Sequence, residues 1–386
     1  MKISSLFFSA LPAATAAGFT NGWQVALGVV FVSGVLFLIL SLIELRMLIF
    51  NAVSPSLKNG IAAGIGLFIA FIGLQQAGVI LKDPGTAVKL NPHFASPDLV
   101  VLFVGMLTTA VLHARRVRGS ILWGIVVATA LACLLKVALP QMPAGVSAAR
   151  DVSESMLNKR FEFAKAFVAL PPSLGPTFLK MDVAHALTPQ MLPFVFVFLF
   201  TLTFDAIGTL IGVCEQAGFM RDNRLPRAKQ AMVSDAIGTV AGAALGTSTV
   251  TSFVESAAGV EAGGRTGLTG LIVAALFLLA LFFSPLIAMI GAYPPITAPA
   301  LPIVGAMMMQ NVAKIEWKDY TESIPAFLIV IGIPLSYSIA DGLALGFISD
   351  AIVKACSGRH REISWLTYLL AIVLVLYFVF VRSRMG

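Results

Sequence analysis

Long apolar segments recur along the whole chain, and they constrain its fold more than any other feature of the sequence. Segments of about 18 or more residues with few charges are typical of helices that cross the hydrocarbon core of a membrane. The chain is 58% hydrophobic and 12% charged, whereas soluble domains are about 25% charged. This composition excludes soluble multidomain enzymes, secreted disulfide scaffolds and nucleic-acid-binding proteins. We therefore expect a polytopic, all-α membrane protein.

Candidate membrane spans fall into two groups. The more polar stretch between them, residues 141–190, carries too many charged side chains to cross a bilayer. The expected spans are 22–42, 60–80, 98–112 and 119–139 before it, and 191–217, 230–245, 253–261, 267–290, 296–311, 323–338, 341–356 and 363–381 after it. Residues 1–17 combine one early lysine with a short apolar stretch, which fits either a signal peptide or an internal half-helix.

Basic residues in the short loops predict the orientation of the chain. They form three clusters: Arg115, Arg116 and Arg118; Arg221, Arg224, Arg227 and Lys229; and Lys354, Arg359 and Arg361. If residues 253–261 join the run before them in one broken crossing, all three clusters face one side, which the positive-inside rule assigns to the cytoplasm. We therefore expect a multi-pass protein of the cytoplasmic (inner) cell membrane. The side reached by the end of 363–381 stays open.

Two stretches resemble each other and indicate an internal repeat. Residues 16–40 (AAGFTNGWQVALGVVFVSGVLFLIL) and 257–281 (AAGVEAGGRTGLTGLIVAALFLLAL) share an opening, a glycine-bearing turn and a long apolar helix. Because the two halves enter the membrane in opposite senses, they predict an inverted repeat whose interrupted helices meet near the bilayer midplane. The spans at 191–217 and 230–245 have no counterparts ahead of residue 17, so we expect the first repeat to lack two helices.

Asp205 is a short carboxylate near the middle of the span 191–217. Such a group costs about 2.5–3.5 kcal/mol on insertion scales, and it cannot reach the interface as a long side chain can. Two interpretations stay open: hydroxyl groups of neighbouring helices satisfy it, or it faces a polar cavity that receives a ligand. We favour the cavity.

Glu255 follows a run, Gly246–Phe253, that is rich in threonine, serine and valine and therefore favours extended backbone. An unwound segment at membrane depth is tolerated where protein or a water-filled cavity satisfies its backbone. The spacing of Ser252 and Glu255 also fits a capping box, in which Glu255 merely holds the start of its own helix. Asp235 is expected to support the broken helix, together with Thr251 and Ser252.

Asp205 and Glu255 together predict one binding site. Two carboxylates accept hydrogen bonds from ligand N–H groups, while free backbone N–H groups at the start of a helix donate hydrogen bonds to acceptor atoms of the ligand. A flat, uncharged heterocycle fits this set better than an inorganic anion, which the carboxylates would repel. Burial raises the pKa of a carboxyl group, so either residue is a candidate proton carrier.

Other chemistry-bearing residues point to no enzyme, cofactor or metal site. Cys133, Cys214 and Cys356 lie far apart and give no metal spacing or disulfide framework. The four histidines fall in or beside loops, and no phosphate loop, nucleotide fingerprint or hydrolase triad is present. Asp341 and Asp350 flank a late helix and are expected at the membrane interface.

Several long motifs resemble those of the nucleobase:cation symporter-2 superfamily (NCS2), in its AzgA-like branch of guanine/hypoxanthine and adenine permeases. They are FDAIGTLIGVCEQAGFM, SDAIGTVAGAALGTSTVTSFVESAAGVEAGGRTGLTGL, GIAAGIGLFIAFIGLQQAGVI, ITAPALPIVGAMMM and IPAFLIVIGIPLSYSIADGLALGF. The resemblance extends from about residue 5 to the end of the chain. It implies fourteen helices in two inverted seven-helix repeats, with core and gate domains, an elevator-like cycle and proton-coupled purine uptake. Family members often form homodimers.

The resemblance also implies roles for individual residues. Asp205 would be the carboxylate of the eighth family helix and Glu255 that of the tenth, with the Val254 backbone N–H beside it. Thr209 would occupy the cavity one turn after Asp205. Phe7 and Phe8 would match an aromatic pair whose backbone lies against the ligand.

The same resemblance divides the chain into four parts. Residues 1–140 would form the incomplete first repeat, with a broken third helix, a fourth core helix and gate helices. Residues 141–190 would be an extracytoplasmic connection, 191–290 the second-repeat core helices with the substrate site, and 291–386 the second-repeat gate helices and a C-terminal hydrophobic segment.

The sequence departs from the family pattern in three ways. The first two family helices have no counterpart, Ser5 stands where the family usually has Asn, and Leu202 where it usually has a second Asp. We therefore expect an upstream start for the gene. The alternatives to a purine transporter are a truncated, non-transporting remnant or subunit of the same fold, a xanthine or uracil permease, and a related anion transporter, against which the paired carboxylates argue.

Overall fold

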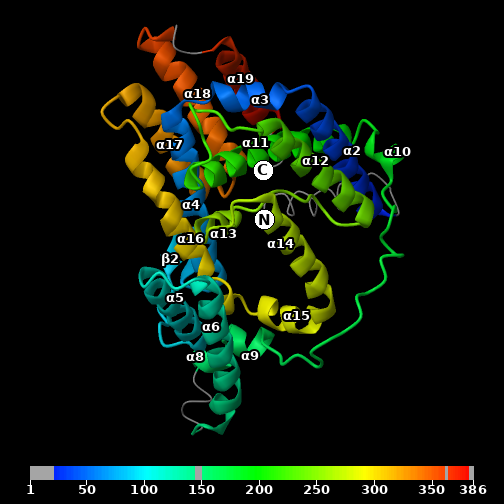
Figure 1. Cartoon of the computed structure of the whole chain (residues 1–386), viewed down its shortest axis with the longest axis vertical. Helices are drawn as coiled ribbons and strands as arrows, with labels where there is room; N and C mark the ends of the chain where they lie inside the picture. The colour runs from blue at the N-terminus through cyan, green and yellow to red at the C-terminus, as the bar shows by residue number, and fades with distance from the viewer. Residues whose placement is uncertain (1–20, 144–149, 361–363, 382–386) are drawn as a thin grey trace. The chain divides into compact units, whose positions relative to one another are not determined.

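The structure is a computed structural model that describes residues 21–143, 150–360 and 364–381, and it is mostly helical (Figure 1). The helices are α2 (Gly22–Leu42), α3 (Leu45–Ala52), α4 (Pro55–Gln76), α5 (Pro97–Ala114), α6 (Ser120–Ala138), α8 (Arg150–Ser153), α9 (Met156–Arg160), α10 (Val183–Ala186), α11 (Leu192–Gln216), α12 (Ala228–Leu245), α13 (Ser256–Glu261), α14 (Gly267–Ala280), α15 (Ser284–Ala292), α16 (Ala300–Met309), α17 (Tyr320–Ser336), α18 (Ile339–Cys356) and α19 (Trp365–Leu376). Strands β1 (Ile80–Asp83) and β2 (Ala87–Leu90) pair as an antiparallel hairpin, with Ile80 opposite Leu90. The prediction of an all-α polytopic fold is confirmed.

Six of the described helical segments are long and apolar enough to cross a membrane. They are Gly22–Leu42, Pro55–Gln76, Pro97–Ala114, Ser120–Gln141, Leu192–Ala217 and Gly267–Ala292. Each overlaps a span expected from the sequence. The second begins five residues early, at Pro55, because proline suits the first turn of a helix and its polar neighbours Lys58 and Asn59 are buried by protein. The hairpin and α3 were not expected.

The described residues form two compact units, of which the first contains residues 21–65, 173–257, 308–360 and 364–381. Within it, α2 packs against α10, α11 and α12. Its apolar core includes Val29, Phe37 and Phe198, and the Ser33 hydroxyl donates to the Val195 carbonyl at 3.1 Å. Helices α17 and α18 form a tightly packed antiparallel hairpin in the same unit (Figure 1).

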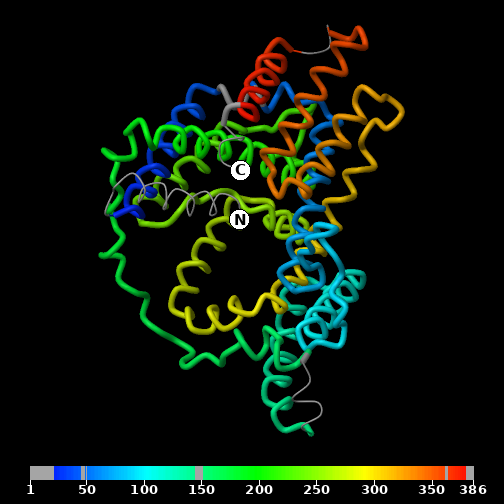
Figure 2. The backbone as a smooth tube through the Cα atoms, turned by 180° about the vertical axis from the view of Figure 1, so that it is seen from behind, coloured from blue at the N-terminus to red at the C-terminus, as the bar shows by residue number. Residues whose placement is uncertain are grey.

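The second unit contains residues 66–143, 150–172 and 258–307. Helices α5 and α6 are an antiparallel pair that lies side by side in both views (Figures 1 and 2). The buried carboxylate of Asp98 joins three elements: it accepts from the N–H groups of Met156 at 2.7 Å and Leu157 at 3.0 Å, and from the Tyr293 hydroxyl at 2.8 Å. This contact fastens part of the polar connection to the start of α5.

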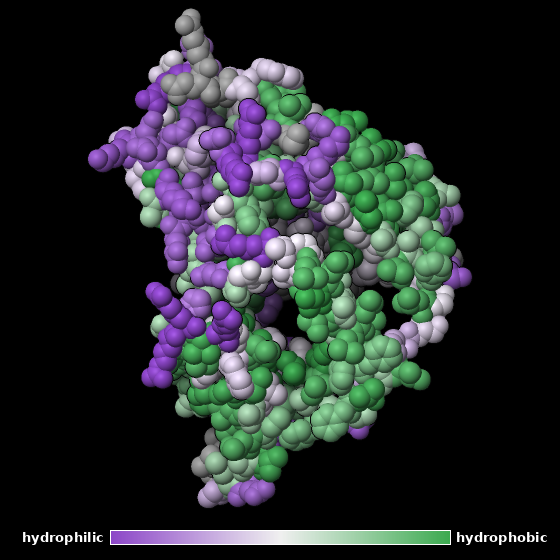
Figure 3. Space-filling model, in the orientation of Figure 1, coloured by the Kyte–Doolittle hydropathy of each residue, from purple (hydrophilic) through white to green (hydrophobic). Residues whose placement is uncertain are grey.

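Helix α14 presents apolar side chains to its surroundings. Leu271, Phe277 and Leu278 are exposed, and the same segment is strongly hydrophobic in the space-filling view (Figure 3). Apolar atoms also cover exposed positions of α5 and α6, such as Leu107 and Leu122. Exposed apolar helix faces of this kind fit a lipid solvent.

Candidate functional site

A break after α12 organises the region of the predicted site. Helix α12 ends at Leu245 and is capped by Gly246, whose φ of +91° is left-handed and favours glycine. The N–H of Thr247 still returns to the Gly242 carbonyl at 3.0 Å, and the chain then runs without regular secondary structure until α13 begins at Ser256. We call residues 247–255 the interruption. The predicted extended segment in a broken helix is confirmed.

One face of α12 holds the interruption in place. Asp235 Oδ1 accepts from the Ser252 N–H at 2.7 Å and from the Ser252 hydroxyl at 2.9 Å. One turn further, the Thr239 hydroxyl donates to the Val250 carbonyl at 2.7 Å. Two turns after Asp235, a Cβ on Gly242 would stand 2.5 Å from the Val250 side chain, so glycine permits this close approach. The residues at i, i+4 and i+7 thus form a continuous seam.

These contacts decide the capping-box alternative. The Ser252 hydroxyl is engaged with Asp235, and α13 starts one residue after Glu255. Glu255 is therefore not at the third position of a helix that Ser252 caps, and this interpretation is wrong. Glu255 is exposed, and its carboxylate makes no hydrogen bond or ion pair with any part of the chain that the structure describes.

The other predicted site residues occupy two elements of the same unit. Asp205 lies within α11 and is partly buried, although its neighbours on both sides are buried. Thr209, one turn later on α11, is buried. Val254 and Thr251 are partly buried within the interruption. Whether Asp205 and Glu255 share one cavity stays a prediction.

The predicted aromatic pair lies near the start of the sequence, before the first described residue. Phe7 and Phe8, and the neighbouring Ser5, fall outside the described residues. Among the residues that are described, no cluster of histidine, cysteine or acidic side chains could hold a metal ion.

A buried ionic cluster joins α17, α18 and the start of α4, and sequence reasoning missed it. Lys354 Nζ lies 2.6 Å from Glu322 Oε1 and 2.8 Å from Asp350 Oδ1. The Ser54 hydroxyl donates to the other Glu322 oxygen at 2.6 Å. Lys354 and Asp350 are only 4% and 5% exposed. The one available signal was the four-residue spacing of Asp350 and Lys354 on a predicted helix.

Comparison with known proteins places this architecture among transporters. Residues 2–380 match a family model, Xan_ur_permease, described as a permease family. The chain is 46% identical over 362 residues to a putative permease of Methanocaldococcus jannaschii, covering 94% of this chain and 77% of the relative. It is 41% identical over 362 residues to the guanine/hypoxanthine permease PbuG of Bacillus subtilis, covering 93% and 76%.

A third relative is the adenine permease AdeP of Escherichia coli, 36% identical over 363 residues, with 94% of this chain and 76% of the relative covered. Among solved structures, the chain is similar to the transmembrane domain of a cyanobacterium bicarbonate transporter, BicA. The TM-score is 0.51 at 16% identity, and the match covers 88% of this chain and 82% of the other. This likeness concerns the fold alone, which is the inverted-repeat fold expected from the sequence.

Proposed function

This chain belongs to the permease family of the NCS2 type, and we propose on that premise that it imports purine nucleobases by proton symport. The relatives named above as guanine/hypoxanthine and adenine permeases support the choice of purines over other nucleobases. The proposed cycle is elevator-like, with the substrate carried by the core helices in the cytoplasmic membrane. The protein acts as a transporter and not as an enzyme.

The observation that carries this proposal is the anchored interruption. It leaves the N–H of Val254 without a hydrogen-bond acceptor among the described residues, just before the exposed carboxylate of Glu255. A purine offers ring nitrogens and carbonyl oxygens to such a donor, and N–H groups to such a carboxylate. Helix α11, most of whose residues are buried, supplies Asp205 and Thr209 as further polar groups in the same unit.

The proposed division of labour follows from the surroundings of each group. Asp235 and Ser252 are engaged with each other, so they position the interruption and do not meet the ligand. Asp205 and Glu255 accept ligand N–H groups, and one of them carries the transported proton. A neutral planar base is preferred over an anion because two carboxylates line the proposed site.

The test is uptake of labelled bases into cells that lack their own purine permeases. Asp205→Asn and Glu255→Gln keep the shape of each side chain and remove its charge, and we expect each to lower hypoxanthine, guanine or adenine uptake at least about tenfold, the equivalent of 1.4 kcal/mol. Asp222→Asn and Glu316→Gln are matched controls, because both residues are exposed on the same unit.

The outcomes separate the parts of the proposal. Unchanged uptake in both site variants, with surface expression equal to the controls, would show that the site assignment is wrong. Uptake of xanthine or uracil in preference to the three purines would change the substrate. Purine uptake that survives a protonophore would refute proton coupling while leaving the site intact.

A further inference from the structure

The loop between α5 and α6 borders a cavity that the transport proposal does not use. The cavity has a volume of about 750 Å³, within the range of small-molecule sites. All its described lining residues belong to the second unit: they lie at the end of α5, in the loop, in the first turns of α6, in part of α13 and at Met307. The loop carries the first basic cluster, on the side that the positive-inside rule assigns to the cytoplasm.

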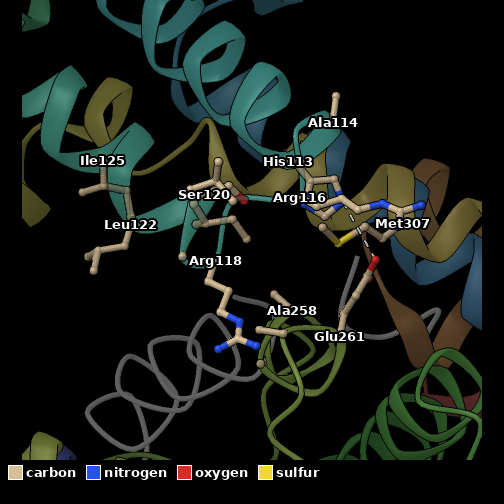
Figure 4. A pocket seen from close by; sticks show the side chains of 15 residues that line it. His113, Ala114, Arg116, Arg118, Ser120, Leu122, Ile125, Ala258, Glu261 and Met307 are labelled. Atoms are coloured by element: carbon tan, nitrogen blue, oxygen red, sulfur yellow. Dashed lines mark ion pairs between the residues drawn. The ribbon is translucent and has the colours of Figure 1, made fainter.

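The loop turns sharply, and its geometry is fixed by the backbone. Arg116 has a φ of +58° and Gly119 a φ of +73°, both left-handed. The N–H of Arg116 donates to the His113 carbonyl and that of Val117 to the Leu112 carbonyl, both at 2.9 Å. Two arginines thereby lie at the rim of the cavity on a short, hydrogen-bonded turn. In Figure 4 their side chains leave the turn in different directions.

The cavity wall offers hydrogen-bond donors that no described residue uses. Helix α6 starts after Gly119, which cannot cap it with a side chain, and the first three residues of α6 line the cavity with free N–H groups. The Ser120 side chain is buried, with 5% exposure, yet its hydroxyl has no hydrogen-bond partner in the described part of the chain. The side chains of Arg116 and Arg118 likewise pair with no described residue.

Among the described lining residues, Glu261 on the opposite wall is the one acidic side chain. Glu261 Oε1 lies 3.9 Å from His113 Nε2, the ion pair drawn in Figure 4. This separation is longer than a hydrogen bond. Below the basic rim the wall is apolar, with Val117, Leu122 and Ile125.

We propose that this cavity binds a phosphate group. Two arginines, a serine hydroxyl and the free N–H groups of a 19-residue helix supply directional donors and positive charge for phosphate oxygens. Arginine suits this ligand because its planar fork meets two phosphate oxygens at once. The phosphate belongs either to the headgroup of an anionic lipid, whose chains would follow the apolar wall, or to a soluble phosphate from the cytoplasm.

The chain offers a matched set of variants for testing this. Arg116→Gln and Arg118→Gln each remove one charge from the cavity, whereas Arg115→Gln removes the same charge from the neighbouring position, which does not line it. Ser120→Ala removes the buried hydroxyl. Glu261→Gln removes the carboxylate that would repel the ligand.

Binding is measured on the purified full chain in two arms. Inorganic phosphate is titrated in uncharged detergent at constant ionic strength, with chloride as the reference anion. In the other arm, native mass spectrometry counts lipids retained from vesicles of phosphatidylglycerol or of phosphatidylcholine. We expect about tenfold weaker binding in Arg116→Gln, Arg118→Gln and Ser120→Ala, no change in Arg115→Gln, and tighter binding in Glu261→Gln.

Binding of phosphatidylglycerol but not of inorganic phosphate would support the proposal with a lipid as the source. Binding of inorganic phosphate would support it with a soluble ligand. Equal losses in Arg115→Gln and the cavity variants would overturn it, because general surface charge would then explain binding. Absence of preference over chloride and phosphatidylcholine in both arms would also overturn it. Neither readout depends on nucleobase uptake.

Discussion

Replacing Lys354 by methionine should strongly destabilise the first unit. The variant keeps the length of the side chain but leaves Glu322 and Asp350 without the ammonium group that contacts both at 2.6 and 2.8 Å. Removing one partner of a buried ion pair leaves the other charge buried and uncompensated, which costs about 3–5 kcal/mol.

The assay compares apparent melting temperatures in one detergent. Lys318→Met is the matched control, because Lys318 is exposed just before α17 and should tolerate the change. The triple variant Lys354→Met/Glu322→Gln/Asp350→Asn buries no net charge, and we expect it to recover most of the lost stability. The reasoning fails if the apparent melting temperature of Lys354→Met equals that of Lys318→Met, or if the triple variant is no more stable than the single one.

Two further predictions concern residues that cap helix ends. Gly246→Ala would force a Cβ into a left-handed position 2.3 Å from the Thr177 Cβ, so we expect a lower melting temperature and lower uptake; Gly259→Ala, which meets open space, should change neither. Hydrogen bonds from Thr321 lower the pKa of Asp319, at the start of α17, to about 2. The stabilising contribution of Asp319 is therefore complete above its ordinary pKa near 4 and is lost as the pH falls towards 2. We expect Asp319→Asn to reduce the change in melting temperature between pH 4 and pH 2.

The sequence predicted the long helices well, because each apolar run is long enough to cross a membrane and polar stretches separate the runs. It misplaced the start of α4, since Lys58 and Asn59 looked like loop residues and only tertiary packing buries them. It also missed the β1–β2 hairpin. That hairpin depends on a turn in which the Asp83 carboxylate accepts from the N–H groups of Gly85 and Thr86, a local feature without an apolar pattern.

The break after α12 was predictable from its composition, but its anchoring needed coordinates. A run of β-branched residues after Gly246 predicts that a helix ends, whereas the hydrogen bonds of Asp235 to Ser252 depend on how the chain folds back. The ionic cluster illustrates the same limit. Asp350 and Lys354 are close in sequence, but Glu322 reaches them only because α17 packs on α18.

The seam along α12 has a consequence for how selectivity could evolve. Asp235, Thr239 and Gly242 contact the interruption at three successive turns of α12. These contacts therefore set the position of the backbone that leads to Val254 and Glu255. If Val254 and Glu255 bind the ligand as proposed, substitutions at Asp235, Thr239 or Gly242 would move these two groups. Such substitutions would alter ligand preference from positions on α12 behind the proposed site.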